Sequence, residues 1–383
     1  MARLWSFPMD GGLVLVRPGE PHLRVLNSSA RLLWEALQRE GELAALPQAL
    51  VRTYGIPAQQ AERDSAAILQ QWRHAGLLES AAPVIPATER IDPDPPIHPA
   101  LPAHFPVTTH YRSFWQPFRF RWGDADLAAR IQPLLAPLGD GSAPGAATLD
   151  LFRDGREIVF CENGAELARA SALDIPLAIL LFRSLVVGRP LQAQLAGLHA
   201  AGLASERGTL LLAGNHGSGK STLAAALCQE GLHYLGDDLI PLLRDSRELA
   251  PLPGSICLKA GSWPVLARRY PALAGMPDYQ RAGQRVRYLP PPPAAYPQRR
   301  GYPARLLVFP SHRPGATTSL RPLSSLEALE RLVACSGLLP STDEPHEVGE
   351  LLAWLRTLPA FAMVHDDLEQ AVARLLDLAR EWL

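Results

Sequence analysis

The sequence predicts an α/β fold built around a phosphate-binding loop, preceded by a small winged-helix α+β domain. Two stretches carry this prediction: the glycine-rich residues 210–238, and residues 1–80, which read as a hairpin followed by three helices. A proline-rich connector at residues 81–106 separates them. With 383 residues and a hydrophobic content of 47%, the chain can bury two or three cores.

The phosphate-binding loop is the turn Gly214-x-x-x-x-Gly219-Lys220-Ser221, which follows an apolar run at residues 210–213 and opens a helix at residues 221–230. Strand, loop and helix in that order make a P-loop. The glycines let backbone N–H groups approach phosphate oxygens, Lys220 brings a mobile positive charge, and the Ser221 hydroxyl suits a Mg²⁺ shell. We expect ATP to contact Gly214, Asn215, His216, Gly217, Ser218, Gly219, Lys220, Ser221 and Thr222.

Two aspartates, Asp237 and Asp238, follow a second short apolar segment at residues 233–236. We expect that segment to return beside the P-loop strand and to leave both carboxylates near the γ phosphate. One carboxylate then joins Ser221 on Mg²⁺, and the other accepts a proton from an attacking hydroxyl. The alternative for such a pair at a strand end is a simple turn or cap.

These residues also carry a family resemblance. Leu198-His199, the P-loop stretch GTLLLAGNHGSGKSTLAAAL and the segment GLHYLGDD resemble the catalytic core of the HPr serine kinases, and more closely the HPr-kinase-related proteins found with peptide-modifying systems. The resemblance covers roughly residues 105–383. It implies a kinase domain of the HPr kinase type, with His199 near the phosphates and Asp237 and Asp238 as metal and base residues in an order left open.

The chain departs from the HPr kinases downstream of the aspartates. Their glutamate-arginine-glycine signature is replaced here by PLPGSICLK at residues 251–259, which speaks against HPr as the substrate and against a reverse phosphorylase reaction. Lys259 and Arg313 are candidates for the missing positive charge, or else ordinary surface cations. Residues 279–305 carry six arginines and no acidic residue. They form either a solvated loop or a mobile segment that receives an acidic substrate or shields the transferred phosphoryl group.

The first eighty residues read as strands at residues 13–27, then a helix capped by residues 27–29, then helical patterns at residues 43–54 and 58–74. The apolar positions Ile68, Leu69, Trp72 and Ala75 share one face of the last helix.

This unit resembles the PqqD family of peptide-binding domains. The resemblance rests on Leu26-Asn27, Trp34, Tyr54-Gly55 and Gly76-Leu77-Leu78. It implies that a leader peptide binds as an added strand on the hairpin edge, with its side chains in the groove beside the third helix. A DNA-binding winged helix and a dimerisation module are the alternatives, and the last helix lacks the basic stripe that DNA binding requires.

Between the two units, prolines at eight positions predict an extended, semi-stiff connector. Residues 107–195 form a β-rich part of the kinase region, ahead of the catalytic domain at residues 196–383. The aromatic and basic residues 108–122 favour a sheet with one buried face over stacking on nucleic acid, and residues 147–164 favour a hairpin around Asp154-Gly155. Further predicted elements are a core helix at 176–187, a buried strand at 306–310, and helices at 324–335 and 367–383.

The composition excludes several classes of protein. A net charge of −1 gives no general attraction to nucleic acid or anionic membranes, and no segment has the ~20 apolar residues needed to span a bilayer. The four cysteines are widely spaced without a CxxC pair, so the sequence favours a cytoplasmic protein without disulfides or zinc.

Together these features predict an ATP- and Mg²⁺-dependent serine or threonine kinase that phosphorylates a peptide or small protein. The two resemblances combined imply a ribosomally made precursor peptide, captured by its leader so that the acceptor is concentrated at the active site. A P-loop ATPase and a nucleotide-sensing peptide chaperone without phosphotransfer are the alternatives. HPr kinases are hexamers, so the resemblance also implies a homo-oligomer.

Overall fold

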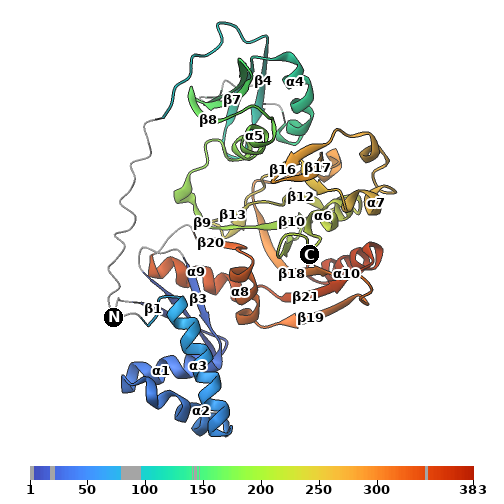
Figure 1. Ribbon diagram of the computed structural model, residues 1–383. Helices are drawn as coiled ribbons and strands as arrows, with labels where there is room; N and C mark the ends of the chain where they lie inside the picture. Colours follow the sequence, from blue (N-terminus) through green and yellow to red (C-terminus); the bar gives the residue numbers. More distant parts are fainter. Residues whose placement is uncertain are drawn as a thin grey trace.

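The computed structural model describes residues 4–17, 22–78, 96–139, 141, 145, 147–340 and 344–383. Three regions follow one another along the chain: a small N-terminal unit, a five-stranded sheet with its helices, and a larger α/β region around a ten-stranded sheet (Figure 1). No helix among these residues is long and apolar enough to cross a membrane.

The N-terminal unit has the expected hairpin and three helices, and it also has a strand ahead of the hairpin. Its elements are β1 (Trp5–Met9), β2 (Gly12–Val16), β3 (Leu23–Leu26), α1 (Ser28–Glu40), η1 (Leu43–Ala45), α2 (Leu46–Tyr54) and α3 (Ala58–His74). The predicted cap is confirmed, because the Asn27 side chain accepts a hydrogen bond from the Ala30 N–H at 3.0 Å. The strands pair in the order β1-β2-β3, which leaves β3 at an edge.

This small sheet is buried on both faces because its strands are apolar at successive positions. Leu13 and Leu15 face the unit's own helices, in a core with Trp34 and Trp72. Val14 and its neighbours on the other face pack against α8 (Ser325–Ala334) and α9 (Pro345–Arg356) of the C-terminal region (Figure 1). The N-terminal unit therefore shares a core with the last third of the chain.

Replacing Gly12 by Ala is expected to destabilise this contact. A Cβ there would lie 2.5 Å from the Leu26 carbonyl oxygen and 2.5 Å from Leu326 Cδ2, so the sheet or α8 must shift. We expect a loss of about 1–3 kcal/mol in the free energy of unfolding, as for other overpacked sites. Thermal denaturation measures it, with Gly275→Ala as the control because a Cβ at Gly275 meets nothing within 4 Å. Equal melting temperatures for the two variants would contradict the close packing.

The second region is a sheet in the order β4-β5-β6-β7-β8. Its elements are β4 (Val107–Arg112), β5 (Pro117–Trp122), α4 (Ala125–Ile131), η2 (Gln132–Leu138), β6 (Ala147–Asp154), β7 (Glu157–Glu162), β8 (Ala165–Ala170) and α5 (Asp174–Val186). Phe118, Phe120 and Trp122 are fully buried in one core with η2 and α5. The predicted buried face and the hairpin between Asp154 and Glu157 are therefore confirmed.

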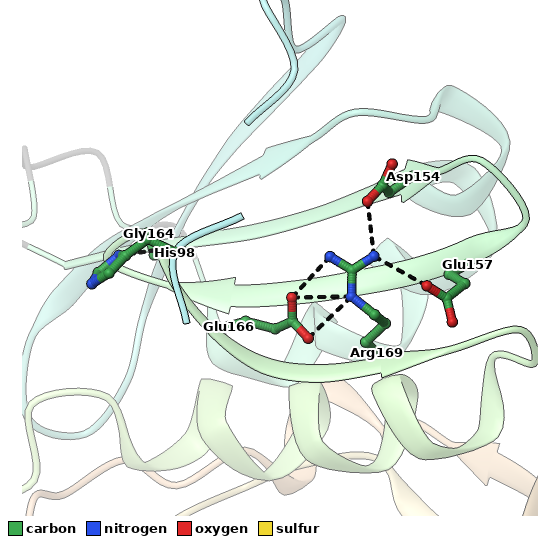
Figure 2. Close-up of polar contacts among 6 residues, drawn as sticks. All are labelled: His98, Asp154, Glu157, Gly164, Glu166 and Arg169. Carbon is green, nitrogen blue, oxygen red and sulfur yellow. Dashed lines mark hydrogen bonds and ion pairs between the residues drawn. The ribbon is translucent and has the colours of Figure 1, made fainter. Parts of the chain in front are cut away.

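One ion-pair cluster and the end of the connector lie on this sheet, as Figure 2 shows. The Arg169 guanidinium binds the carboxylates of Asp154, Glu157 and Glu166 at 2.8, 3.1 and 2.9 Å. The Glu166 N–H donates to the Ile97 carbonyl oxygen at 2.8 Å. Within the connector, residues 96–106 form neither helix nor strand, as expected, but lie against the sheet, and residues 81–95 lie outside the described residues.

The third region holds the ten-stranded sheet. Its main path is β12-β10-β11-β18-β14-β13-β9-β20, with β21 pairing β18 and β19. The elements are η3 (Leu191–Ala193), β9 (Gln194–Leu198), β10 (Ala200–Ala204), β11 (Thr209–Ala213), α6 (Lys220–Gln229), β12 (His233–Gly236), β13 (Ile240–Leu243), β14 (Glu248–Leu249), β15 (Ile256–Lys259), α7 (Ser262–Leu266), η4 (Pro271–Gly275), β16 (Tyr279–Arg281), β17 (Gln284–Leu289), η5 (Pro293–Ala295), β18 (Tyr302–His312), β19 (Ser319–Leu323), α8, β20 (Leu338–Pro340), α9, β21 (Ala360–His365) and α10 (Leu368–Trp382). A small sheet, β15-β17-β16, stands beside it.

The expectation that residues 233–236 lie directly beside the P-loop strand is wrong. β12 pairs with β10, and β10 pairs with β11, so β10 occupies the position between them. The short turn at residues 205–208 folds β10 back onto β11 before β12 is reached. Because β11 and β12 are both antiparallel to β10, they are parallel to each other, and both end at the same edge of the sheet. The aspartates after β12 therefore still approach the P-loop.

Candidate functional site

The predicted P-loop, residues 214–219, lies between a fully buried strand, β11, and the N-terminus of α6. Gly219 has φ +98°, a left-handed conformation that favours glycine, and no side chain caps α6. Lys220 Nζ donates to the carbonyl oxygens of Gly214 at 2.6 Å and Asn215 at 3.3 Å. Burial lowers the pKa of Lys220, whose side chain is folded back over the loop. Backbone N–H groups at a helix N-terminus and a lysine charge are the groups that an anion would need.

The two aspartates have different surroundings. Asp237 is only 9% exposed and lies near the hydroxyls of Tyr234 and Ser221. Burial, and to a smaller extent the negative charge of Asp238, raise the pKa of Asp237 to about 7, and the two hydroxyls partly oppose this rise. Asp238 is exposed, and its carboxylate accepts a hydrogen bond from the Arg281 guanidinium at 2.9 Å. One carboxylate is therefore enclosed with the P-loop serine, and the other is open to solvent.

Mg²⁺ fits the enclosed half of this site. Within the described parts of the chain, no group of three or more His, Cys, Asp or Glu side chains forms a metal cluster. Mg²⁺ in nucleotide sites needs fewer protein ligands, because phosphate oxygens and water complete its shell. The Ser221 hydroxyl and the Asp237 carboxylate are the oxygen donors available for it, and the buried carboxylate is the kind of group that a cation would stabilise.

His199 and Lys259 also line the P-loop pocket, a cavity of about 120 Å³. His199 lies between β9 and β10, and its ring centroid is 5.9 Å from that of His216. Burial lowers the pKa of His199, and the positive charge of Lys220 lowers it further, so the neutral imidazole is favoured. Lys259 ends β15 and is exposed. Ser262, at the start of α7, joins the pocket through a 2.7 Å hydrogen bond with Thr222.

Arg313 is not brought to this site. It follows the end of β18, where its backbone N–H donates to the His365 carbonyl oxygen at 2.8 Å, and its side chain is exposed. It lines none of the three cavities around the P-loop. β18 pairs with β11 and continues to His312, and Arg313 is the first residue after the strand.

The positive charge that meets the aspartates comes instead from Arg281, at the end of β16. The arginine-rich residues 279–305 begin as the hairpin of β16 and β17, and are not irregular throughout. Arg285 and Arg287 pair with Asp278, away from the aspartate pair. The acid-free run of arginines was the only sequence signal for Arg281, and it could not distinguish one arginine from the other five.

Among the described residues, cavities lie at the predicted P-loop and beside it. The central one holds Lys220, Ser221 and both aspartates. A second cavity, of about 450 Å³, lies on the side of residues 214–218 toward Phe309 and Arg331. A third cavity, of about 280 Å³, lies on the aspartate side and is largely apolar. A phosphate chain in the central cavity would therefore have open space at both ends.

The comparison with known protein families concerns the N-terminal unit. Residues 12–78 match the family described as "Coenzyme PQQ synthesis protein D (PqqD)". No curated protein matches the chain. PqqD-type domains bind precursor peptides, which is consistent with a peptide partner. Residues 12–78 thus form a PqqD-like domain, followed by a mixed α/β region.

Proposed function

We propose that the protein is an ATP-dependent serine or threonine kinase that phosphorylates a precursor peptide held by its PqqD-like domain. The observation that carries the proposal is the different exposure of the two carboxylates. Asp237 is enclosed with Ser221 and Lys220, while Asp238 is accessible to an incoming substrate. A nucleotidase also needs a group that positions its attacking water, so the feature that favours a kinase is the open cavity beside Asp238. An open carboxylate beside an accessible cavity is suited to an acceptor hydroxyl.

In the proposed reaction, the α6 N-terminus and Lys220 bind the β and γ phosphates of ATP, and Ser221 and Asp237 hold Mg²⁺. When bound, Mg²⁺ neutralises charge on those phosphates. Asp238 accepts the proton of the acceptor hydroxyl while the hydroxyl oxygen forms a bond to the γ phosphorus. The bond between the γ phosphorus and the oxygen that bridges it to the β phosphate breaks, and ADP is released. Arg281 orients Asp238, while His199 and Lys259 stand where they can donate to the transferred group.

The PqqD-like domain gives this site its substrate. β3 is an edge strand, so its outer backbone groups can pair with an extended peptide. Arg24 of β3 donates to the Ala75 carbonyl oxygen at 3.3 Å, which fixes the strand to the end of α3. A leader held in this position keeps the acceptor near the kinase site and raises its effective concentration.

The test is mass spectrometry of precursor peptides encoded beside the gene after incubation with the protein, Mg²⁺ and ATP. We expect a peptide to gain one phosphate on a serine or threonine. Lys220→Ala should abolish the gain because the phosphates lose their charged ligand. Excess free leader should slow the transfer by competition at β3 and should leave the basal hydrolysis of ATP unchanged. Hydrolysis of ATP without any phosphopeptide would instead favour an ATPase or a nucleotide-dependent peptide chaperone.

A further inference from the structure

The apolar cavity beside the aspartates is built by the β-rich region. η2 contributes Leu134, Leu135 and Leu138, and α5 contributes Ala178, Leu181 and Leu185. Phe182 of α5 also lines the cavity, and this large apolar side chain is 45% exposed. The cavity therefore has apolar walls and an apolar residue facing solvent.

The same cavity adjoins the proposed phosphate site. His199, Asp237 and Asp238 line both the apolar cavity and the P-loop pocket. A ligand that fills the apolar cavity therefore meets the open carboxylate with one end. Its opposite end meets the leucines of η2 and α5.

The acceptor, and not the nucleoside, fits this side of the P-loop. An acceptor hydroxyl must lie within hydrogen-bond reach of Asp238, which does not line the cavity on the other side near Phe309 and Arg331. A purine base would also need hydrogen-bond partners. The Ser255 hydroxyl in the apolar cavity already donates to the Leu134 carbonyl oxygen at 2.7 Å, and Arg281 is bound to Asp238. The rest of the lining is mostly aliphatic and aromatic, and it suits an aliphatic or aromatic side chain.

We infer that this cavity selects the substrate: it receives a large apolar side chain adjacent in sequence to the phosphorylated serine or threonine. The inference rests on the proposed kinase function and adds a substrate class to it. Burial of the neighbouring side chain between η2 and α5 positions the acceptor hydroxyl at Asp238. A peptide with polar residues next to the acceptor serine or threonine leaves the apolar walls of the cavity uncovered, so its hydroxyl is not positioned in this way.

Two synthetic peptides that differ only beside the acceptor serine test this selection, one with leucine on both sides and one with glutamine. We expect kcat/KM to be at least about ten-fold higher for the leucine peptide, the discrimination that an apolar pocket typically gives. Versions with alanine in place of the serine are measured for binding in the presence of Mg²⁺ and ADP. The leucine version should bind more tightly by a similar factor.

Ala178→Phe fills the cavity and should remove the preference in both assays, with ADP affinity unchanged. The matched control is Ala172→Phe, because Ala172 is exposed just before α5 and does not line the cavity. Equal binding and equal rates for the two peptides would overturn the inference and leave the kinase proposal standing. Loss of ADP affinity in Ala178→Phe would also overturn it, by assigning the cavity to the nucleoside. If the leucine peptide bound more tightly but no peptide were phosphorylated, the result would support the role of the cavity in binding an apolar side chain and would refute the proposed kinase activity.

Discussion

Replacing Asp238 by Asn is expected to lower the rate of phosphoryl transfer by about 10²–10⁴-fold, the usual contribution of a general base. The amide keeps the size of the side chain but cannot accept the proton of the acceptor hydroxyl. The affinity for ATP should change little, because the proposed ligands of the phosphates and of Mg²⁺ are Lys220, Ser221 and Asp237, while Asp238 is exposed and is bound by Arg281. Single-turnover transfer and equilibrium nucleotide binding measure the two quantities separately.

Asp245→Asn is the control for this variant. Asp245 is exposed in the turn between β13 and β14, lines none of the cavities around the P-loop, and loses the same charge when replaced. It should retain the wild-type transfer rate. Wild-type transfer by Asp238→Asn would assign the proton to another group, and the enclosed Asp237 would be the first to test.

The parts of the site that the sequence predicts are those determined by local backbone chemistry. The P-loop follows from glycines whose positive φ angles are needed for the turn, and from a strand and a helix directly beside it. The first helix of the N-terminal unit follows from its cap, Asn27, and from the spacing of its apolar residues. Such signals lie within one or two turns of the chain, so they can be read without knowledge of the rest of the fold.

The parts that the sequence does not predict depend on contacts between distant segments. Nothing local distinguishes Arg281 from the other arginines of its segment, because its role comes from the position of the β16–β17 hairpin beside Asp238. The apolar run of β2 predicts a strand, but what covers its second face is known only once α8 is placed against Gly12. The apolar cavity is likewise lined by residues of η2 and α5 together with Asp237 and Asp238, which lie about fifty residues or more later in the chain. Pairings of this kind are set by tertiary packing, which the residue types alone do not encode.

Asp237→Asn should make the ligand-free protein more stable at pH 8 while abolishing its Mg²⁺-dependent activity. Burial raises the pKa of Asp237 from 3.8 in the unfolded chain to about 7 in the folded protein. The folded state therefore binds the proton more tightly, and the stability of the wild type falls as the pH rises from about 4 to about 7. Above that range the ionised, buried carboxylate imposes its full cost, up to about 4 kcal/mol for a shift of this size. An amide at this position carries no charge and avoids the cost.

Thermal denaturation of the two proteins at a series of pH values tests this expectation. The gap in melting temperature between Asp237→Asn and the wild type should be widest above pH 7 and should close as the pH approaches 4. Asp245→Asn should show no such gap, because its carboxylate is exposed. Mg²⁺ with ADP should raise the melting temperature of the wild type at pH 8 more than that of Asp237→Asn, since the cation needs the ionised carboxylate. If the difference in melting temperature did not depend on pH, ionisation of Asp237 would not destabilise the folded protein. The argument that Asp237 is a buried carboxylate in need of a metal ion would then fail.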